Sequence, residues 1–342
     1  VDHLNDVDLH DISQVEIVKG PSSLLYANGT IGGIINIVDD CISALNYELP
    51  EISVGYETQS VNDGNAENFN FKNNINGFNV NFGYKNIDFG NYDIPSGAIL
   101  HEEEDHDDHD DHDEDEHHDE DMGFLNNSDY AVEATKFGIS KVGDWGYVGF
   151  SVDNLESVYG IPFHGDEHGD EHGDEHGDEH GDEEEHDEHG EERIFSTTDS
   201  ESFTIKGSYN INGSLINKID FNYRDSDYSL TEAHEEEEHH EEDEHDEEEE
   251  HEEHAPTVFM NEAVEYGATF DISNDSSTQK VVVNFVDEDN SIVGEEAFMN
   301  PANSKEFTIG YYLSKDLGIY DLDVGFRHDQ IERSGSVTEE EH

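Results

Sequence analysis

Three segments of the chain consist almost entirely of histidine, aspartate and glutamate. They cover residues 101–121, 164–192 and 234–254, and glycine is the only other residue type in them. Together they hold nineteen of the 23 histidines, so imidazole is concentrated where carboxylate is densest. Neutral imidazole nitrogens and carboxylate oxygens are ligands for Zn(II), and also for Cu(II), Ni(II) and iron. These tracts therefore predict capture of divalent metal ions, and the alternative is that they are solvated acidic spacers.

The second tract shows how loose such a ligand array would be. Its HGDE unit occurs five times in a row, which places histidine and glycine at the same four-residue spacing. Glycine and unbalanced negative charge both oppose a helix, so we expect a chain that is disordered without metal and wraps ions at many weak sites. The candidate metal-binding histidines of the tracts are His101, His106, His109, His112, His117, His118, His164, His168, His172, His176, His180, His186, His189, His234, His239, His240, His245, His251 and His254.

The charge of the chain restricts its partners. Fourteen basic residues stand against 89 acidic ones, for a formal net charge of -75. Nucleic acid is therefore excluded as a partner, because a phosphate-binding surface must be basic. The acidic field would concentrate divalent cations near the tracts, although salt screens it beyond ~8–10 Å. The same field favours protonated imidazole, so metal binding should weaken as the pH falls.

Several other classes of function have little support in the sequence. Cys41 is the only cysteine, which excludes an internal disulfide and a thiolate metal site. The chain has no apolar run of ~18 residues, so we expect no transmembrane helix. It contains no recognisable catalytic triad, phosphate-binding loop or paired acids, so we expect no enzyme. Because it starts at Val1 and stops within the acidic run TEEEH, we expect a piece of a longer protein.

Outside the tracts, apolar and polar residues alternate in the manner of β-strands. Tight turns alternate with long connections along the chain, and all three tracts lie in long connections. This alternation is typical of an antiparallel outer-membrane β-barrel, and a soluble β-sandwich is the alternative. The predicted strands cover residues 51–59, 67–75, 77–88, 145–154, 202–211, 217–230, 265–273, 280–286, 306–315 and 320–333.

The segment ISQVEIVKGPSSLLYANGTIGGIINIV (12–38) differs from the remaining sequence. It closely resembles the end of the plug domain of TonB-dependent outer-membrane receptors, and the alternative is a glycine-rich hairpin in a soluble protein. The resemblance implies an all-β chain, with the C-terminal part of a plug at 1–40 and the first part of a transmembrane β-barrel at 50–342. It also implies a Gram-negative outer membrane, contact with its lipid, and a TonB-type energy-coupling protein as partner. The tracts would then be extracellular loops.

Three further stretches resemble the zinc-uptake branch of these receptors. They are VYGIPFHGDEHG (158–169), DYSLTEAH (227–234) and VGEEAFMNPANSKEFTIGYYL (293–313). The likeness implies zinc as cargo and no organic cofactor. The chain departs from this branch in the length and acidity of its tracts, and it lacks the first half of the plug, the energy-coupling segment and the later barrel strands.

A collector of ions does not by itself explain their passage, so we expect a defined site between plug and barrel. Asp2 and His3 resemble an Asp-His pair that ligates metal on the outer face of the plug in the zinc-uptake branch. An ordinary polar loop is the alternative. His10 is a weaker candidate ligand, and Glu295 and Glu296 could supply carboxylates from the barrel side.

Two other readings of the function remain open. Within the receptor fold, the cargo could be haem, a ferric siderophore or copper, although haem ligation needs one or two fixed histidines in an apolar pocket. In a different class, the chain could be a surface metal buffer that transports nothing. The plug-like residues 12–38 argue against a buffer, which has no lumen to close. Imidazole and carboxylate serve zinc, copper and nickel alike, so residue types do not select the metal.

Overall fold

The computed structural model describes residues 12–26, 33–96, 98, 123–162, 193–211, 213, 215–235, 255–294 and 297–335. The acidic tracts lie outside these residues, apart from the backbone of His234 and Glu235 at the end of a strand. No helix in the described part of the chain is both long and apolar enough to cross a membrane, a finding that concerns helices alone.

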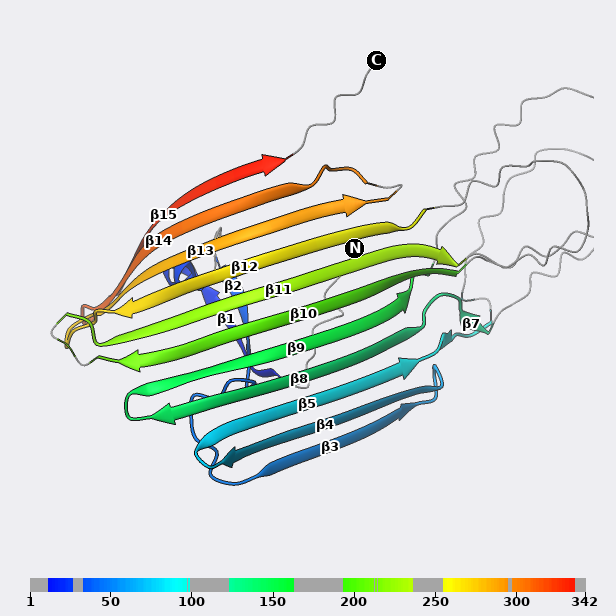
Figure 1. Cartoon of the computed structure of the whole chain (residues 1–342), viewed down its shortest axis with the longest axis horizontal. Helices are drawn as coiled ribbons and strands as arrows, with labels where there is room; N and C mark the ends of the chain where they lie inside the picture. The colour runs from blue at the N-terminus through cyan, green and yellow to red at the C-terminus, as the bar shows by residue number, and fades with distance from the viewer. Residues whose placement is uncertain are drawn as a thin grey trace, which may run out of the picture.

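Eleven antiparallel strands form one sheet, in the order β15-β14-β13-β12-β11-β10-β9-β8-β5-β4-β3. Almost every strand therefore pairs with its neighbours in the chain (Figure 1). Short strands β6 (Tyr92–Asp93) and β7 (Phe124–Leu125) form a separate pair. The predicted all-β, antiparallel fold is confirmed. The sheet strands are β3 (Glu51–Gln59), β4 (Gly64–Ile75), β5 (Phe78–Phe89), β8 (Tyr130–Gly143), β9 (Gly146–Gly160), β10 (Arg193–Asn210), β11 (Lys218–Glu235), β12 (Thr257–Asp271), β13 (Thr278–Val293), β14 (Ala302–Asp316) and β15 (Asp321–Gly335).

One end of the sheet, which we call the turn end, carries the tight connections that the sequence predicts. They join β4 to β5, β8 to β9, β10 to β11, β12 to β13 and β14 to β15. Between β4 and β5, Asn76 and Gly77 have φ angles of 53° and 81°. These left-handed conformations suit Asn-Gly, and they match the twist of a two-residue hairpin turn.

The opposite end, which we call the mouth end, holds the strand ends that flank the tracts. Gly160 lies opposite Phe195, and Arg193 lies opposite Glu235 at the far end of the next strand. The second tract therefore leaves β9 and returns in β10 at this end, and the third joins β11 to β12 there. The first tract leads from β6 to β7, between the mouth ends of β5 and β8.

The strands differ from the predicted segments mainly at the mouth end. β10 starts at Arg193 and β12 at Thr257, eight or nine residues before the segments predicted from alternation, and β8 is not among those segments. Alternation disappears near the mouth, because β10 carries polar residues on both faces there and residues 258–260 of β12 are apolar on both faces. Backbone pairing with neighbouring strands nevertheless continues, because each ladder hydrogen bond needs no particular side chain.

The N-terminal segment lies across one face of the sheet (Figure 1). Strands β1 (Ile12–Lys19) and β2 (Gly33–Asp39) pair antiparallel, and the 3₁₀ helix η3 (Gly20–Leu25) follows β1. The Leu24 side chain packs on Gly310 of β14 and Gly325 of β15, where any larger residue would meet it. We call the face that this segment contacts the inner face, and the opposite one the outer face.

Candidate functional site

The predicted metal ligands fall almost entirely outside the described residues. This holds for Asp2, His3, His10, Glu295 and Glu296, and for every tract histidine except His234. The backbone of His234 lies in β11, opposite Ile194 of β10. The placement of the predicted metal ligands relative to one another therefore stays a prediction. Within the ranges that the structure describes, no group of three or more histidine, cysteine or acidic side chains could hold a metal ion.

The backbone that anchors the second tract is held firmly on both sides. The Arg193 guanidinium forms an ion pair with the Asp129 carboxylate and lies over the Phe195 ring, 5.1 Å from its centroid. The Gly160 amide donates a 2.9 Å hydrogen bond to the Asp129 carbonyl. The tracts are thus attached to a fixed rim, formed by adjacent strands from β5 to β12.

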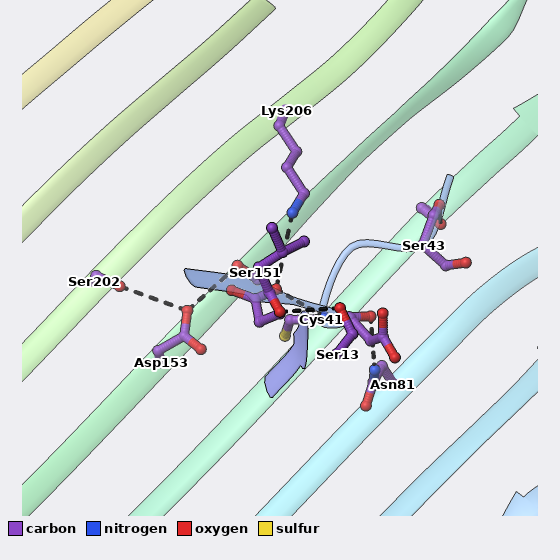
Figure 2. Close-up of polar contacts among 12 residues, drawn as sticks. Ser13, Cys41, Ser43, Asn81, Ser151, Asp153, Ser202 and Lys206 are labelled. Carbon is purple, nitrogen blue, oxygen red and sulfur yellow. Dashed lines mark hydrogen bonds and ion pairs between the residues drawn. The ribbon is translucent and has the colours of Figure 1, made fainter. Parts of the chain in front are cut away.

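Far below this rim, the loop after β2 is pinned to the inner face by ion pairs (Figure 2). The Lys72 ammonium of β4 lies 3.0 Å from the Asp40 carboxylate, and Lys206 of β10 lies 3.8 Å from Asp39. The Asn81 side-chain amide adds a 2.9 Å hydrogen bond to the Asp40 carbonyl. Strands that are well separated in the sheet therefore hold two adjacent aspartates, β10 at Asp39 and β4 and β5 at Asp40.

A buried amide continues this contact toward the turn end. Asn79 is 2% exposed, and its amide nitrogen donates to the Leu45 carbonyl at 3.0 Å and to the Ser140 hydroxyl at 3.2 Å. Its amide oxygen accepts from the Tyr47 backbone N–H at 3.1 Å. The Ser140 hydroxyl in turn donates to the Ser43 carbonyl at 2.6 Å. The Ser43, Leu45 and Tyr47 backbone groups of the loop thus each have a hydrogen-bond partner on the sheet.

The loop also approaches the sheet more closely than side chains would permit. Gly138 of β8 faces the Cys41 carbonyl, and Gly149 of β9 faces the Ile42 side chain. A β-carbon at position 149 would lie 2.6 Å from the Ile42 Cγ2 atom. Cys41 and Ile42 are consequently buried. Burial raises the pKa of the Cys41 thiol to about 12, and the nearby Asp153 and Asp39 carboxylates add to the effect.

Asp153 lies on the inner face of β9, beside this contact (Figure 2). Its carboxylate accepts hydrogen bonds from the hydroxyls of Ser151 at 3.3 Å and Ser202 at 3.5 Å. Asp153 pairs in register with Lys136 on one side and with Ser202 on the other. Sequence reasoning missed this group. The only available signal was an aspartate on the polar side of an alternating strand.

The outer face divides into two zones. Toward the turn end it carries an apolar belt, in which aromatic rings pair across strands, such as Phe150 with Phe203 and Tyr266 with Phe285. Toward the mouth end the same rows become polar and acidic, for example at Glu156, Asp199 and Glu201. Members of the belt with exposed side chains are Ile52, Val54, Tyr56, Val148, Phe150, Val152, Phe203, Phe221, Tyr266, Phe307, Ile309, Leu322, Val324 and Phe326.

Comparison with known proteins assigns the N-terminal part of the chain. Residues 1–34 match the family model of the TonB-dependent Receptor Plug Domain. The N-terminal segment therefore resembles the plug domain of TonB-dependent receptors. Strand β1 and helix η3 lie within the matched residues, and β2 starts at their end. We call residues 12–47 the plug segment, or plug, and the contacts around Asp39 to Tyr47 join it to the sheet.

The plug and sheet together resemble solved structures of an iron transporter and of a ferric preacinetobactin receptor. The FrpB iron transporter from Neisseria meningitidis (F3-3 variant) superposes with a TM-score of 0.64 at 12% identity, over 96% of this chain and 48% of that one. The apoprotein form of its F5-1 variant gives 0.60 at 13% identity, over 96% and 47%. BauA, the ferric preacinetobactin receptor from Acinetobacter baumannii, gives 0.53 at 12% identity, over 95% and 47%.

These likenesses establish the fold alone, because the identities are low. The chain spans about half the length of each of these proteins. The predicted partial barrel with the C-terminal part of a plug is confirmed as a fold. The resemblance to the zinc-uptake branch and the predicted metal ligands remain predictions.

Proposed function

We propose that the chain is part of a TonB-dependent outer-membrane receptor that takes up a divalent metal ion, with zinc as its cargo. The observation that carries the proposal is the shared position of the tracts. The strand ends that flank all three of them lie at the mouth end. Ions collected by the tracts would therefore be concentrated above the inner face, which the plug segment contacts lower down.

The composition of the outer face supports placing the sheet in the outer membrane. Its belt of exposed aromatic and aliphatic side chains would be costly in water but suits contact with lipid. Above the belt, the strands continue into the acidic zone and would project beyond the membrane toward the cell exterior. Lipid of the outer membrane is thus one partner of the protein, and a TonB-type energy-coupling protein would be the other.

Passage through the receptor needs a defined site in addition to the tracts. Asp2 and His3, at the start of the plug segment, are the proposed ligands, with His10 as a weaker candidate. Glu295 and Glu296 lie in the connection from Val293 of β13 to Ala302 of β14, both at the mouth end. Carboxylates in this connection would be available to an ion that enters from the tracts.

Uptake of a ferric chelate is the second candidate function. It is favoured by the solved structures, since one is named an iron transporter and another a ferric preacinetobactin receptor. The density of imidazole in the tracts favours a free divalent ion instead, because an iron that is already chelated needs few further ligands.

Uptake measurements on cells distinguish the two candidates. Radioactive zinc and a ferric siderophore are supplied separately to a strain that expresses the protein and to a matched strain without it. We expect accumulation of zinc that also requires the energy-coupling protein, and induction of the protein by zinc starvation alone. Accumulation of the ferric siderophore without zinc would contradict the proposal.

A further inference from the structure

The outer face carries a groove at the boundary between the apolar belt and the acidic zone. Its volume is about 410 Å³, within the range of about 300–1,000 Å³ that is usual for small-molecule sites. Residues of four adjacent strands, β8 to β11, line it. On β10 the exposed Glu201 and Phe203 side chains line the groove, whereas Lys206 reaches the plug on the opposite face. The groove is therefore separate from the contact between plug and sheet.

The lower level of the groove, nearer the turn end, is mainly apolar. Phe137 of β8, Val152 of β9 and Phe203 of β10 lie side by side in register. Val152 is 45% exposed and Phe203 is 36% exposed, so a ligand can reach both side chains. The row changes character at β11, where Asp225 lies opposite Phe203. A hydrocarbon chain can thus lie across three strands, with a carboxylate at the end of the row.

The next level toward the mouth end is polar throughout. In register from β8 to β11, it consists of Thr135, Asn154, Glu201 and Asp227. The Asn154 amide donates a hydrogen bond to the Glu201 carboxylate at 3.3 Å, and the Tyr223 hydroxyl donates to the Asp225 carboxylate at 3.2 Å. Both donors are neutral, so these hydrogen bonds leave the negative charge of the groove in place.

Negative charge therefore gathers on one side of the groove. Glu201, Asp225 and Asp227 are exposed and belong to the adjacent strands β10 and β11. No lysine or arginine is among the described residues that line the groove. Anionic lipid heads are attracted by basic side chains, so this surface disfavours a lipid that ends in a phosphate. A cationic head group is complementary to the carboxylates, and the apolar row suits the chain attached to it.

We propose that the groove holds a membrane lipid whose head group ends in an amine. Its acyl chain lies on Phe137, Val152 and Phe203, and its ammonium group donates charge-assisted hydrogen bonds to the carboxylates of β10 and β11. The apolar row alone would accept any lipid chain, so the carboxylates provide the selectivity. This inference goes beyond the proposed uptake function, because it concerns the class of lipid and not the cargo. It uses only the placement of the outer face in the membrane.

Photochemical labelling tests this preference directly. The whole receptor is reconstituted in nanodiscs of phosphatidylcholine that contain a trace of a probe with a diazirine in its alkyl chain. One probe is a long-chain alkylamine, and the other is an alkyl sulfate of the same length. Labelled peptides are identified by mass spectrometry. We expect the amine to label residues 135–137 and 152–154 about tenfold more than the sulfate does, because only the amine can pair with the carboxylates.

Removal of the groove carboxylates should abolish the preference. The variant combines Glu201→Gln, Asp225→Asn and Asp227→Asn, which keep the size of each side chain and leave the backbone ladder intact. Labelling of the groove by the amine should fall to the level reached by the sulfate. Equal labelling of the unmodified groove by the two probes would overturn the proposal.

A matched variant distinguishes the groove from the overall charge of the outer face. It combines Glu67→Gln, Asp88→Asn and Glu332→Gln, which remove the same number of exposed carboxylates outside the groove. We expect it to keep the preference for the amine, and an equal loss in both variants would overturn the proposal. Labelling of belt residues 307–309 by both probes shows that the sheet is in the bilayer. Zinc uptake plays no part in the measurement, so its result is independent of the cargo.

Discussion

Gly138 of β8 lies against the backbone carbonyl of Cys41, so close that a β-carbon at position 138 would overlap that oxygen. The contact joins the plug to the middle of the sheet, and Cys41 and Ile42 are buried by it. Because the obstacle is backbone, a rotamer change cannot relieve the overlap. Seating of the plug segment thus depends on the absence of a side chain at one position of one strand.

Gly138→Ala is therefore expected to loosen the plug. Overpacking of a close contact costs about 1–3 kcal/mol, and here the loop after β2 must move away from the sheet. Limited proteolysis should cut the loop faster in the variant, and the thermal unfolding midpoint should fall. Gly123→Ala is the control, since nothing lies within 4 Å of a β-carbon at that position. Equal behaviour of the two variants would contradict the assignment.

Asn79→Ala is expected to destabilise the same contact through lost hydrogen bonds. The substitution leaves the Leu45 carbonyl and the Tyr47 N–H without their side-chain partner on β5. Buried polar groups without partners cost ~1–3 kcal/mol each, so denaturant unfolding in detergent should show a loss of about 2 kcal/mol or more. Asn73→Ala, on the outer face of the adjacent strand, should have little effect. A loss confined to Asn73→Ala would refute this role for Asn79.

The Cys41 thiol is expected to resist alkylation in the folded protein. Its pKa rises from an ordinary value of 9.0 to about 12, so at pH 8 only about one molecule in ten thousand would carry the thiolate. Denaturation should restore rapid reaction with iodoacetamide, and Cys41→Ser should not react in either state. Fast alkylation of folded protein at pH 8 would show that the thiol is accessible and ionised.

The same shift predicts a dependence of stability on pH. The folded state holds the neutral Cys41 thiol more strongly than the unfolded state does. The resulting contribution to the free energy of unfolding is fully present below pH 9.0. It is lost as the pH rises from 9.0 toward about 12. Comparing the unfolding of wild type and Cys41→Ser at pH 8 and pH 11 isolates the contribution of this group. The difference in stability between the two proteins should become less favourable to wild type at the higher pH.

Deleting residues 101–121, 164–192 and 234–254 should separate collection from transport. Fewer metal ions should bind in calorimetry, and uptake should slow when zinc is scarce. Uptake in plentiful zinc should be nearly intact, because the site of passage remains. A matched protein with glutamine at every tract histidine keeps the length and negative charge, so it reports the contribution of imidazole alone. Loss of uptake even in excess zinc would mean that the tracts belong to the site of passage.

Asp2→Ala combined with His3→Ala should have the opposite effect. Bulk metal binding should hardly change, since the tracts are untouched. Uptake should fall at every zinc concentration, because removing two ligands from a site of about four leaves too few to hold the ion. Asn5→Ala serves as the control in the same segment. Normal transport by the double variant would remove Asp2 and His3 from the proposed site.

Alternation along the chain was enough to predict most strands, since one residue in two on each strand faces an apolar surface. The segment 51–59 coincides with β3, and the tight turns between β4 and β5 and between β14 and β15 fall where polar and glycine residues interrupt the alternation. β8 escaped prediction because Ala131, Glu133 and Thr135 interrupt its apolar row. The upper half of β10 escaped because polar residues occupy both of its faces, and that of β12 escaped because the successive apolar residues 258–260 fall on both faces.

The sequence by itself determined the composition of the tracts, the periodicity of the strands and the likeness of residues 12–38 to a plug, because each is a local property of the chain. Only the tertiary structure decided that Asp39, Lys206 and Asp153 meet, and that Gly138 and Gly149 admit the Cys41 loop. These contacts join residues far apart in the chain, through strand register and close approach across the sheet. Neither leaves a local pattern, since a single lysine, aspartate or glycine in a strand looks the same whether or not a plug lies against it.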